Sequence, residues 1–319
     1  MLHLRLAVPD DLSAEVLAVL EPDHAVCNLA VTRGGSLKPV GDLVEADIAR
    51  EAADGLLSRL RTLGLHDRGG ITIFTIEASP SRNAVEAERR APGAPDDAVV
   101  WDAVRDGAEG QSHGSWSYYV FLCLATLIAS VAVVTDSAIL VVGAMVVGPE
   151  FSAVAALSVG LALGRPRLSV RALGLLVRGF ALAIGVTTLL ALLAVAVGWL
   201  DAATVAAPRP MTGFIYRPDH WSLVVAVLAG AAGVLSTTAG RSNALVGVFI
   251  SVTTVPAAGD FSVALATGAW SQLGGAAAQL GINLLGMTVA GVLTLLLQRA
   301  LWERLLRRRH PAPAGLRRV

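Results

Sequence analysis

The sequence has few of the residues and motifs on which covalent catalysis depends. Its two cysteines, Cys27 and Cys123, are too few for a disulfide framework or a cysteine metal site. It lacks His-Glu-x-x-His, Gly-x-Ser-x-Gly and Walker motifs, so we expect neither an enzyme nor a nucleotide-driven pump. The sequence predicts no catalytic residue, metal ion or nucleic-acid partner, and it indicates no cofactor.

Charge is scarce in the last two thirds of the chain. Residues 115–298 contain only 12 charged side chains, and 54% of the whole chain is hydrophobic, as in an integral membrane protein. Residues 1–114 instead hold 11 basic and 19 acidic residues. This contrast predicts a soluble domain at 1–80, a linker at 81–114, a membrane domain at 115–298 and a basic tail at 299–319. No secretory signal opens the chain, so we expect the soluble domain to stay in the cytoplasm.

The soluble part alternates between strand and helix patterns. Residues 2–8 alternate apolar and polar side chains, and residues 12–20 have apolar side chains at helical spacing. Further strands are expected near residues 25–32, 42–48 and 71–76, with a helix at 50–63. The order βαββαβ predicts a small α+β ferredoxin-like domain. It could sense a ligand and regulate the membrane part, or be a cap without a ligand.

A short helix is expected within the linker, at residues 96–108. It carries Val99, Val100 and Val104 on one side, with Trp101 nearby. Indole rings favour the headgroup region, so this helix could lie at the membrane interface. A helix on the protein surface explains the pattern equally well.

Six apolar stretches predict an α-helical integral membrane bundle. They cover residues 116–134, 137–163, 172–200, 221–239, 244–270 and 276–297. The second is interrupted by Gly148-Pro149, and the fifth by the four residues 256–259. These two stretches are therefore predicted to be broken helices.

The two halves of this region resemble each other. A shift of 107 residues lays Pro149 on Pro256 and the third span on the sixth. Because each half has three spans, the second would cross in the opposite sense, which predicts an inverted three-plus-three repeat. Arginines gather on the side of the two termini, so both termini are expected in the cytoplasm, beneath the bacterial inner membrane. The basic tail could also hold anionic lipid headgroups.

The interruptions are where function is expected. A proline frees a backbone carbonyl that lipid cannot satisfy, so each break must face protein or water. Two breaks at equivalent positions would bring half-helix ends together, where ions or polar solutes bind. A packing kink is the alternative explanation. The candidate pathway residues at the breaks are Gly143, Gly148, Pro149, Glu150, Thr253, Thr254, Pro256, Gly259 and Asp260.

Ionisable side chains within the spans are costly and therefore candidates for function. Glu150 directly follows the first break and is the leading candidate. Arg178 could neutralise Glu150 or contact an anion, or its side chain could reach the cytoplasmic interface. Asp260 is expected one short turn beyond the second break, and Asp136 is expected to cap the second span.

These residues carry a resemblance to a known family. The Thr135-Asp136-Ser137-Ala138-Ile139 segment, followed by Gly143-Ala144-Met145 and Pro149, resembles the domain of unknown function 389 family of prokaryotic membrane proteins. Residues 243–256 look like its second proline-containing span. The resemblance covers roughly residues 101–297 and implies fold and location, but no reaction. In this chain Glu150 and Phe151 follow the proline, where the family tends to have small residues and prolines.

The sequence therefore predicts a membrane transporter or channel for a small polar solute or ion, with its site between the two broken helices and a regulatory cytoplasmic domain. The alternative is a membrane-anchored sensor or scaffold that transports nothing and acts through its ferredoxin-like domain. Membrane lipid and a small solute or ion are the expected partners. Abundant small residues are compatible with a homo-oligomer.

Overall fold

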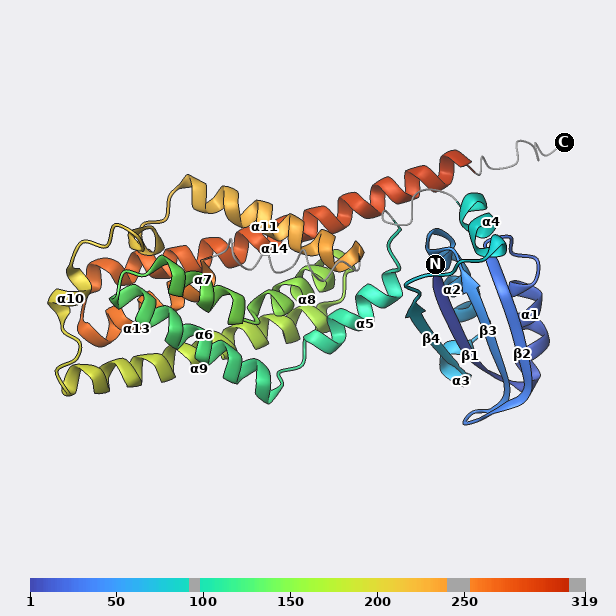
Figure 1. Cartoon of the computed structure of the whole chain (residues 1–319), viewed down its shortest axis with the longest axis horizontal. Helices are drawn as coiled ribbons and strands as arrows, with labels where there is room; N and C mark the ends of the chain where they lie inside the picture. The colour runs from blue at the N-terminus through green and yellow to red at the C-terminus, as the bar shows by residue number, and fades with distance from the viewer. Residues whose placement is uncertain (92–97, 240–252, 310–319) are drawn as a thin grey trace. The chain divides into compact units, whose positions relative to one another are not determined.

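The computed structural model describes residues 1–91, 98–239 and 253–309 (Figure 1). The chain forms two compact units. Unit 1 comprises Met1–Val104 together with the C-terminal residues from Ala300, and unit 2 comprises Arg105–Arg299. Each unit is described separately below.

Unit 1 contains all the strands among the described residues. They are β1 (Leu2–Pro9), β2 (Val26–Leu37), β3 (Val40–Ile48) and β4 (Gly70–Thr75). Its helices are the 3-10 helix η1 (Asp10–Leu12), α1 (Ser13–Leu20), α2 (Arg50–Thr62), α3 (Leu65–Arg68) and α4 (Arg82–Arg90), followed by the start of α5 (Trp101–Gln111). The predicted alternation of strand and helix segments is present.

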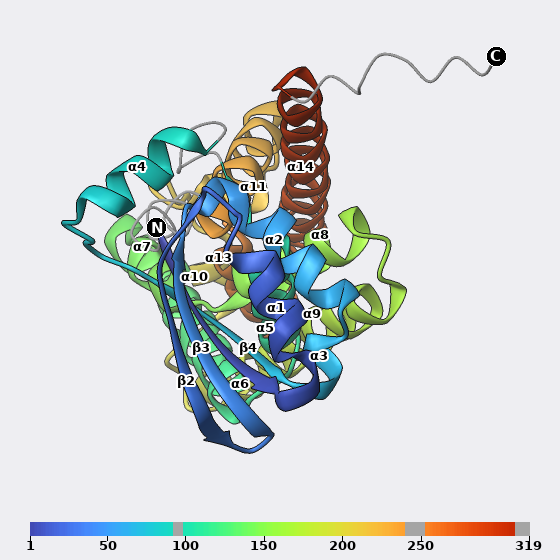
Figure 2. The ribbon, with the colours of Figure 1, turned by 90° about the vertical axis from the view of Figure 1, so that its right-hand side faces the viewer.

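The four strands form one sheet in the order β2-β3-β1-β4, and all neighbouring strands are antiparallel. On β1 the side chains of Leu2, Leu4, Leu6 and Val8 are buried, because alternate residues of a strand face the same side. Helices α1 and α2 cover this face of the sheet (Figure 2). Their apolar side chains join those of β1 in one hydrophobic core.

A buried carboxylate ties the β2–β3 hairpin to helix α1. The Ser13 hydroxyl donates to Asp42 over 2.5 Å, and the Gly34 N–H donates to the same carboxylate over 2.9 Å. Arg33 donates to it as well, over 2.5 Å. The Ser13 and Gly34 hydrogen bonds, helped by Arg33, lower the pKa of Asp42 to about 2.

We expect this carboxylate to make the stability of unit 1 depend on pH. Its pKa is below the value of about 3.9 for an unfolded chain, so its contribution is complete above that value and is lost as the pH falls towards 2. Asp42→Asn should lower the melting temperature at neutral pH and flatten this acid dependence. The β-sheet amide I infrared band of the full chain measures it, since unit 1 holds all the described strands. An unchanged acid dependence in the variant would contradict this role.

Unit 2 is a bundle of helices. After the end of α5 it contains α6 (Trp116–Val134), α7 (Ala138–Val147), α8 (Glu150–Ala162), α9 (Pro166–Ala196), α10 (Ala202–Ala206), the 3-10 helix η3 (Gly213–Tyr216), α11 (His220–Ala239), α13 (Thr254–Thr267) and most of α14 (Trp270–Arg309). Helices α6 and α9 pack on α13, and α8 packs on α9. The long helices α9 and α14 run along the bundle (Figure 1).

Four of these helices are long and apolar enough to cross a membrane. They are α6, α9, α11 and α14, and the bent pair α7–α8 raises the number of candidate spans to five. They coincide with the predicted first, third, fourth, sixth and second spans. Of the predicted fifth span, α13 has 14 residues, while residues 244–252 lie outside the described part of the chain.

The first predicted break is confirmed. Helices α7 and α8 meet at an angle of 53°. The residue before a proline is excluded from the helical region, and Gly148 accordingly has an extended ψ of 127° that ends α7. Helix α8 then restarts at Glu150.

The predicted interruption of the fifth span at residues 256–259 is wrong. Residues 256–259 are part of the continuous helix α13, which begins at Thr254. Pro256 is in the first turn, where a missing backbone N–H breaks no intrahelical hydrogen bond. Pro256 therefore does not interrupt the helix.

Three pairs of helices begin at the same separation along the chain. Helix α11 begins 104 residues after α6, α13 begins 104 residues after α8, and α14 begins 104 residues after α9. This separation differs from the 107 residues at which the two prolines coincide. Glu150 is therefore at the same position in α8 as Thr254 in α13.

Candidate functional site

Glu150 and Thr254, the first residues of α8 and α13, contact each other. The Thr254 hydroxyl donates to Glu150 Oε1 over 2.5 Å. Both side chains are buried, with 6% of Glu150 and 0% of Thr254 exposed. The structure thus brings together the ends of the two helices on which the sequence placed the breaks. Two helix N-termini with their partial positive charges converge on one carboxylate.

The neighbouring Thr253 is held by helix α14. Gln279 and Asn283 each donate a side-chain hydrogen bond of 2.9 Å to the Thr253 hydroxyl. The two amide side chains are four residues apart and share one helix face. These two hydrogen bonds fix the start of α13 against α14.

A cavity of about 240 Å³ with both apolar and polar lining residues reaches this point. Its lining includes Thr253, Gln279 and Asn283 at one end, and Asp219 and Ser222 from the connection before α11 and its first turn. Asp219 is exposed. The cavity therefore extends from the surface near Asp219 to Thr253, next to the Glu150–Thr254 contact.

The other side of the Glu150 carboxylate is tightly packed. Its Oε2 atom is buried and has no hydrogen-bond partner. A Cβ atom on Gly148 would lie 2.4 Å from this oxygen and 2.8 Å from a methyl group of Val255. Only glycine leaves room here, which explains Gly148 beside Pro149 in the break.

Asp260 belongs to a second buried polar cluster, farther along α13. Arg209 donates to Asp260 over 2.5 Å and to Gln272 over 2.7 Å, and its guanidinium lies 4.5 Å from the centre of the Tyr216 ring. The side chains of Asp260 and Arg209 are 0% and 3% exposed. Gln272 also donates to the Val205 carbonyl. This cluster attaches the 201–219 connection to α13 and α14.

Breaking this ion pair from one side should cost more than removing both charges. Arg209→Gln leaves a buried unpaired carboxylate and is expected to lower the free energy of unfolding by about 3–5 kcal/mol. Asp260→Asn is expected to be similarly damaging, whereas the double variant should lose clearly less than the sum.

Thermal or denaturant unfolding of the full chain in detergent measures this cycle. The matched control is Arg68→Gln, which removes the Arg68–Asp11 pair, whose side chains are 52% and 60% exposed. We expect that change to stay within about 1 kcal/mol. Additive single effects would show that Arg209 and Asp260 act independently.

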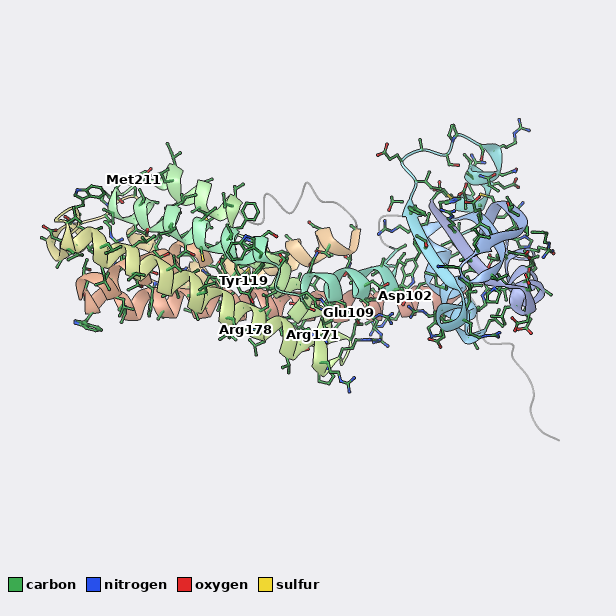
Figure 3. All side chains as sticks on the ribbon, turned by 90° about the horizontal axis from the view of Figure 1, so that it is seen from below. Asp102, Glu109, Tyr119, Arg171, Arg178 and Met211 are labelled. Carbon is green, nitrogen blue, oxygen red and sulfur yellow. The ribbon has the colours of Figure 1, made fainter. Side chains whose placement is uncertain are left out.

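Arg178 lies away from Glu150. It is exposed on α9 and donates to the Gly174 carbonyl of its own helix, and Figure 3 shows it with Arg171 along the edge of that helix. Helix α9 has 31 residues and is about 46 Å long, against about 30 Å for a bilayer core. The residues after Arg178 can span most of the core by themselves. This placement favours the interface explanation over a contact with Glu150.

Other predicted positions have structural roles. Gly143 is exposed on α7, away from the junction. Gly259 allows α13 to approach α6, because a Cβ atom there would lie 2.8 Å from the Ala129 side chain. The expectation that Asp136 caps the second span is wrong. Ser137 caps α7, while Asp136 accepts hydrogen bonds from Met211 and Thr212.

The hydrogen bonds at Asp136 also affect its ionisation. Partial desolvation raises the pKa of Asp136, but the hydrogen bonds from Thr212 and Met211 outweigh it, so that the net shift is downwards. A bend with a positive φ of 47° directs the residue towards residues 211–212. Aspartate tolerates this conformation better than most residues.

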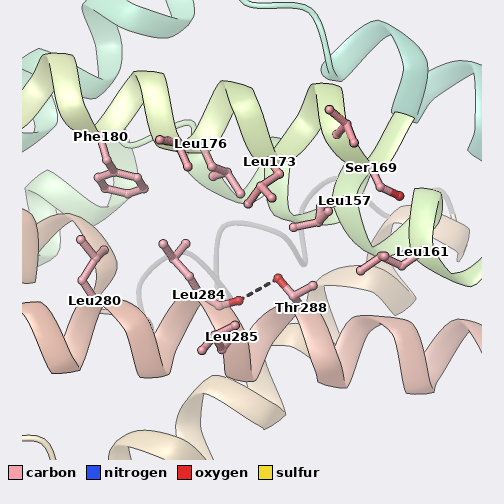
Figure 4. A pocket seen from close by; sticks show the side chains of 12 residues that line it. Leu157, Leu161, Ser169, Leu173, Leu176, Phe180, Leu280, Leu284, Leu285 and Thr288 are labelled. Carbon is pink, nitrogen blue, oxygen red and sulfur yellow. Dashed lines mark hydrogen bonds between the residues drawn. The ribbon is translucent and has the colours of Figure 1, made fainter. Parts of the chain in front are cut away.

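A larger groove of about 570 Å³ lies between α8, α9 and α14 (Figure 4). Its lining is leucine-rich, and its two hydroxyl groups are both used within their own helices. Ser169 donates to the Arg165 carbonyl, and Thr288 to the Leu284 carbonyl. The groove offers no free polar group and is unsuited to a polar solute.

Sequence reasoning missed the part that Arg209, Gln279 and Asn283 have in these clusters. Arg209 lies between α10 and η3, outside the predicted spans. The signal that could have found it is Asp260 itself, because a carboxylate at that depth requires a partner. For a metal ion, no group of three or more histidine, cysteine or acidic side chains is found in residues 1–91, 98–239 and 253–309.

Comparisons with known proteins agree with the resemblance seen in the sequence. The model of the domain of unknown function 389 (DUF389) family matches residues 145–289, which include α8, α13 and the polar end of α14. Residues 145–289 are a DUF389 region. The match confirms the resemblance to this family over that region.

One relative of the DUF389 region is an uncharacterised protein, MJ0678, from Methanocaldococcus jannaschii. It is 23% identical over 173 residues, which are 54% of this chain and 51% of the relative. The chain thus spans about half the length of this curated relative. No solved structure matches the chain.

Proposed function

We propose that this DUF389 protein moves a small polar solute or ion across a membrane, without enzymatic activity, through the junction of α8 and α13. The observation that carries the proposal is the Glu150–Thr254 hydrogen bond. It joins the N-termini of two half-helices in a bundle rich in apolar helices, the arrangement that secondary transporters use for solute and ion sites. A packing kink alone would not require a buried carboxylate.

The proposal includes six spans arranged as an inverted three-plus-three repeat. The common separation of 104 residues between three pairs of helix starts supports it. So does the contact between Glu150 and Thr254, which are equivalent positions in that register. Two equivalent residues related by a twofold axis can touch only where they lie beside that axis. The junction would then be at the centre of the membrane domain.

The sidedness follows from the distribution of arginines. We propose that both termini and unit 1 are on the cytoplasmic side of the bacterial inner membrane. The 201–219 connection would then face the opposite side, and the cavity beside Thr253 would be the vestibule from which a solute reaches the junction. Membrane lipid as a partner and a homo-oligomer remain predictions.

Unit 1 would regulate this movement. Its element order and the strand order β2-β3-β1-β4, with antiparallel neighbours, support the proposed ferredoxin-like fold. Small sheets of this kind serve many functions, so the fold alone does not identify a ligand.

Flux through reconstituted liposomes tests the proposal. The purified full chain should accelerate the passage of at least one probe among glycerol, urea, neutral amino acids, potassium and chloride. Glu150→Gln and Thr254→Val should each lower that flux by about threefold to tenfold, because each alters the hydrogen bond that joins the two helix ends, and such a bond is worth about 0.5–1.5 kcal/mol.

The matched control for these variants is Thr135→Val. Thr135 is exposed, and its hydroxyl bonds only to the Val131 carbonyl of its own helix. This variant should leave flux unchanged. Equal flux in the Glu150→Gln variant and the wild type would exclude the junction as the pathway, and the absence of flux for every probe would count against transport.

A second candidate function is ligand sensing by unit 1. A cavity of about 620 Å³ in this unit is lined by Asp23, His24, Glu51, Asp54 and Arg59 among others. Burial raises the pKa of Glu51 and of Asp54. Glu51 Oε2 is buried without a partner, an arrangement that suits a positively charged amine.

Thermal shifts of the full chain test this candidate. Putrescine, spermidine and lysine are the probes, and succinate is the anionic control. If Glu51 holds a cation, an amine should raise the melting temperature of the β-sheet infrared band, and Glu51→Gln should abolish the increase. A sensor without transport would give these shifts with no flux of any probe, whereas the absence of any shift would leave sensing unsupported.

A further inference from the structure

Two buried oxygen atoms at the junction have no hydrogen-bond donor. They are Glu150 Oε2 and Gln279 Oε1. Only 6% of Glu150 and 2% of Gln279 is exposed. They flank the Thr253–Thr254 pair, since Glu150 accepts from Thr254 while Gln279 donates to Thr253. Unsatisfied acceptor oxygens on both sides of this pair favour a ligand that carries a positive charge or a hydrogen-bond donor. They disfavour an anion.

No basic side chain of the described residues neutralises Glu150. The groups that bond to it are the Thr254 hydroxyl and its own backbone amide. Arg209 pairs with Asp260, Arg178 bonds within α9 and Arg165 lies 3.5 Å from Glu109. Arg167 and Arg171 are exposed.

The helices that surround the junction add no further charge. Helix α7 has no titratable side chain, α14 has none before Arg299, and α11 has only His220 at its start. Helix α6 carries the titratable residues Tyr118, Tyr119 and Cys123, of which the Tyr118 phenol interacts with Glu150 electrostatically. On α13 the titratable residue is Asp260, which is paired with Arg209. Within the part of the chain that the structure describes, an ionised Glu150 would thus be a buried charge without a basic partner.

We propose that Glu150 binds a proton, and that this proton is the coupling ion for solute that enters through the cavity beside Thr253. The coupling rests on the proposed function, whereas proton binding does not. Gly148 and Val255 pack closely around Glu150 Oε2 and leave little space for a larger cation. A proton can bind this oxygen without additional space. Release converts the carboxylic acid to a carboxylate and gives the proton to water in the cavity. The Thr254 hydroxyl and the helix N-termini stabilise the remaining charge.

The cavity indicates which solutes could share the site. Apart from Asp219 at its outer end, its polar groups are the neutral side chains of Ser222, Thr253, Gln279 and Asn283. Hydroxyl and amide groups of this kind recognise a solute by hydrogen bonds rather than by charge. The solute class is therefore a small neutral or zwitterionic molecule, and the proton supplies the charge that moves with it.

Infrared difference spectroscopy of the purified full chain at neutral pH tests proton binding. The wild type should have a carboxylic-acid carbonyl band that Glu150→Gln removes and that Thr254→Val shifts without removing. Asp67→Asn, which changes a carboxylate whose side chain is 76% exposed and lies outside the cavity, should leave the band unchanged. Retention of the folded state is checked by the helical amide I band. No carboxylic-acid band in the wild type, or a band that persists in Glu150→Gln, would overturn the proposal.

Transport under a pH gradient tests the coupling separately. With a neutral amino acid or glycerol as the probe, an inwardly directed gradient of one pH unit should drive up to about tenfold accumulation for one proton per solute. Glu150→Gln should abolish accumulation. If the flux of the probe is the same with and without the pH gradient, the proposed proton coupling is wrong, but transport itself is not contradicted. No flux of any probe would overturn transport and coupling together, while the infrared band would still decide whether Glu150 holds a proton.

Discussion

The structure of unit 2 depends on one short hydrogen bond between two helix ends. Glu150 and Thr254 are 104 residues apart in the chain, yet they meet in the middle of an apolar bundle. A carboxylate placed there without a donor would destabilise the fold. The Thr254 hydroxyl supplies a donor to one of its oxygens. The polar residues of α14 are arranged around this contact.

Asp260 shows the other way in which this chain stabilises a buried carboxylate. It is completely buried like Thr254, but it has a guanidinium partner that is itself held by Gln272 and stacked on Tyr216. The two acidic side chains are thus treated differently within the same bundle. Each carboxylate has one buried oxygen without a hydrogen-bond partner among the described residues. Asp260 is paired with the Arg209 guanidinium, whereas Glu150 has no basic partner among the residues that the structure describes.

The parts of the fold that local chemistry determines could be predicted from the sequence. The alternation in residues 2–8 predicted β1, and Gly148-Pro149 predicted the first break, because a proline restricts the residue before it wherever it occurs. Pro256 was misleading, since the effect of a proline depends on its distance from the helix start, which the sequence did not specify. The partners of buried charged side chains could not be predicted from the sequence either. Arg209 and Asp260 are 51 residues apart, and only the packing of the bundle pairs them.

The repeat spacing has a consequence for how such a protein could have evolved. If two copies of one ancestral segment are related by a symmetry axis, a residue beside that axis contacts the equivalent residue of the other copy. Two glutamates in that place would repel, and two threonines would leave no group to titrate. Divergence at this single position, with glutamate in one half and threonine in the other, turns a self-repelling contact into a donor and an acceptor. The loss of identity between the halves is then what makes their junction chemically useful.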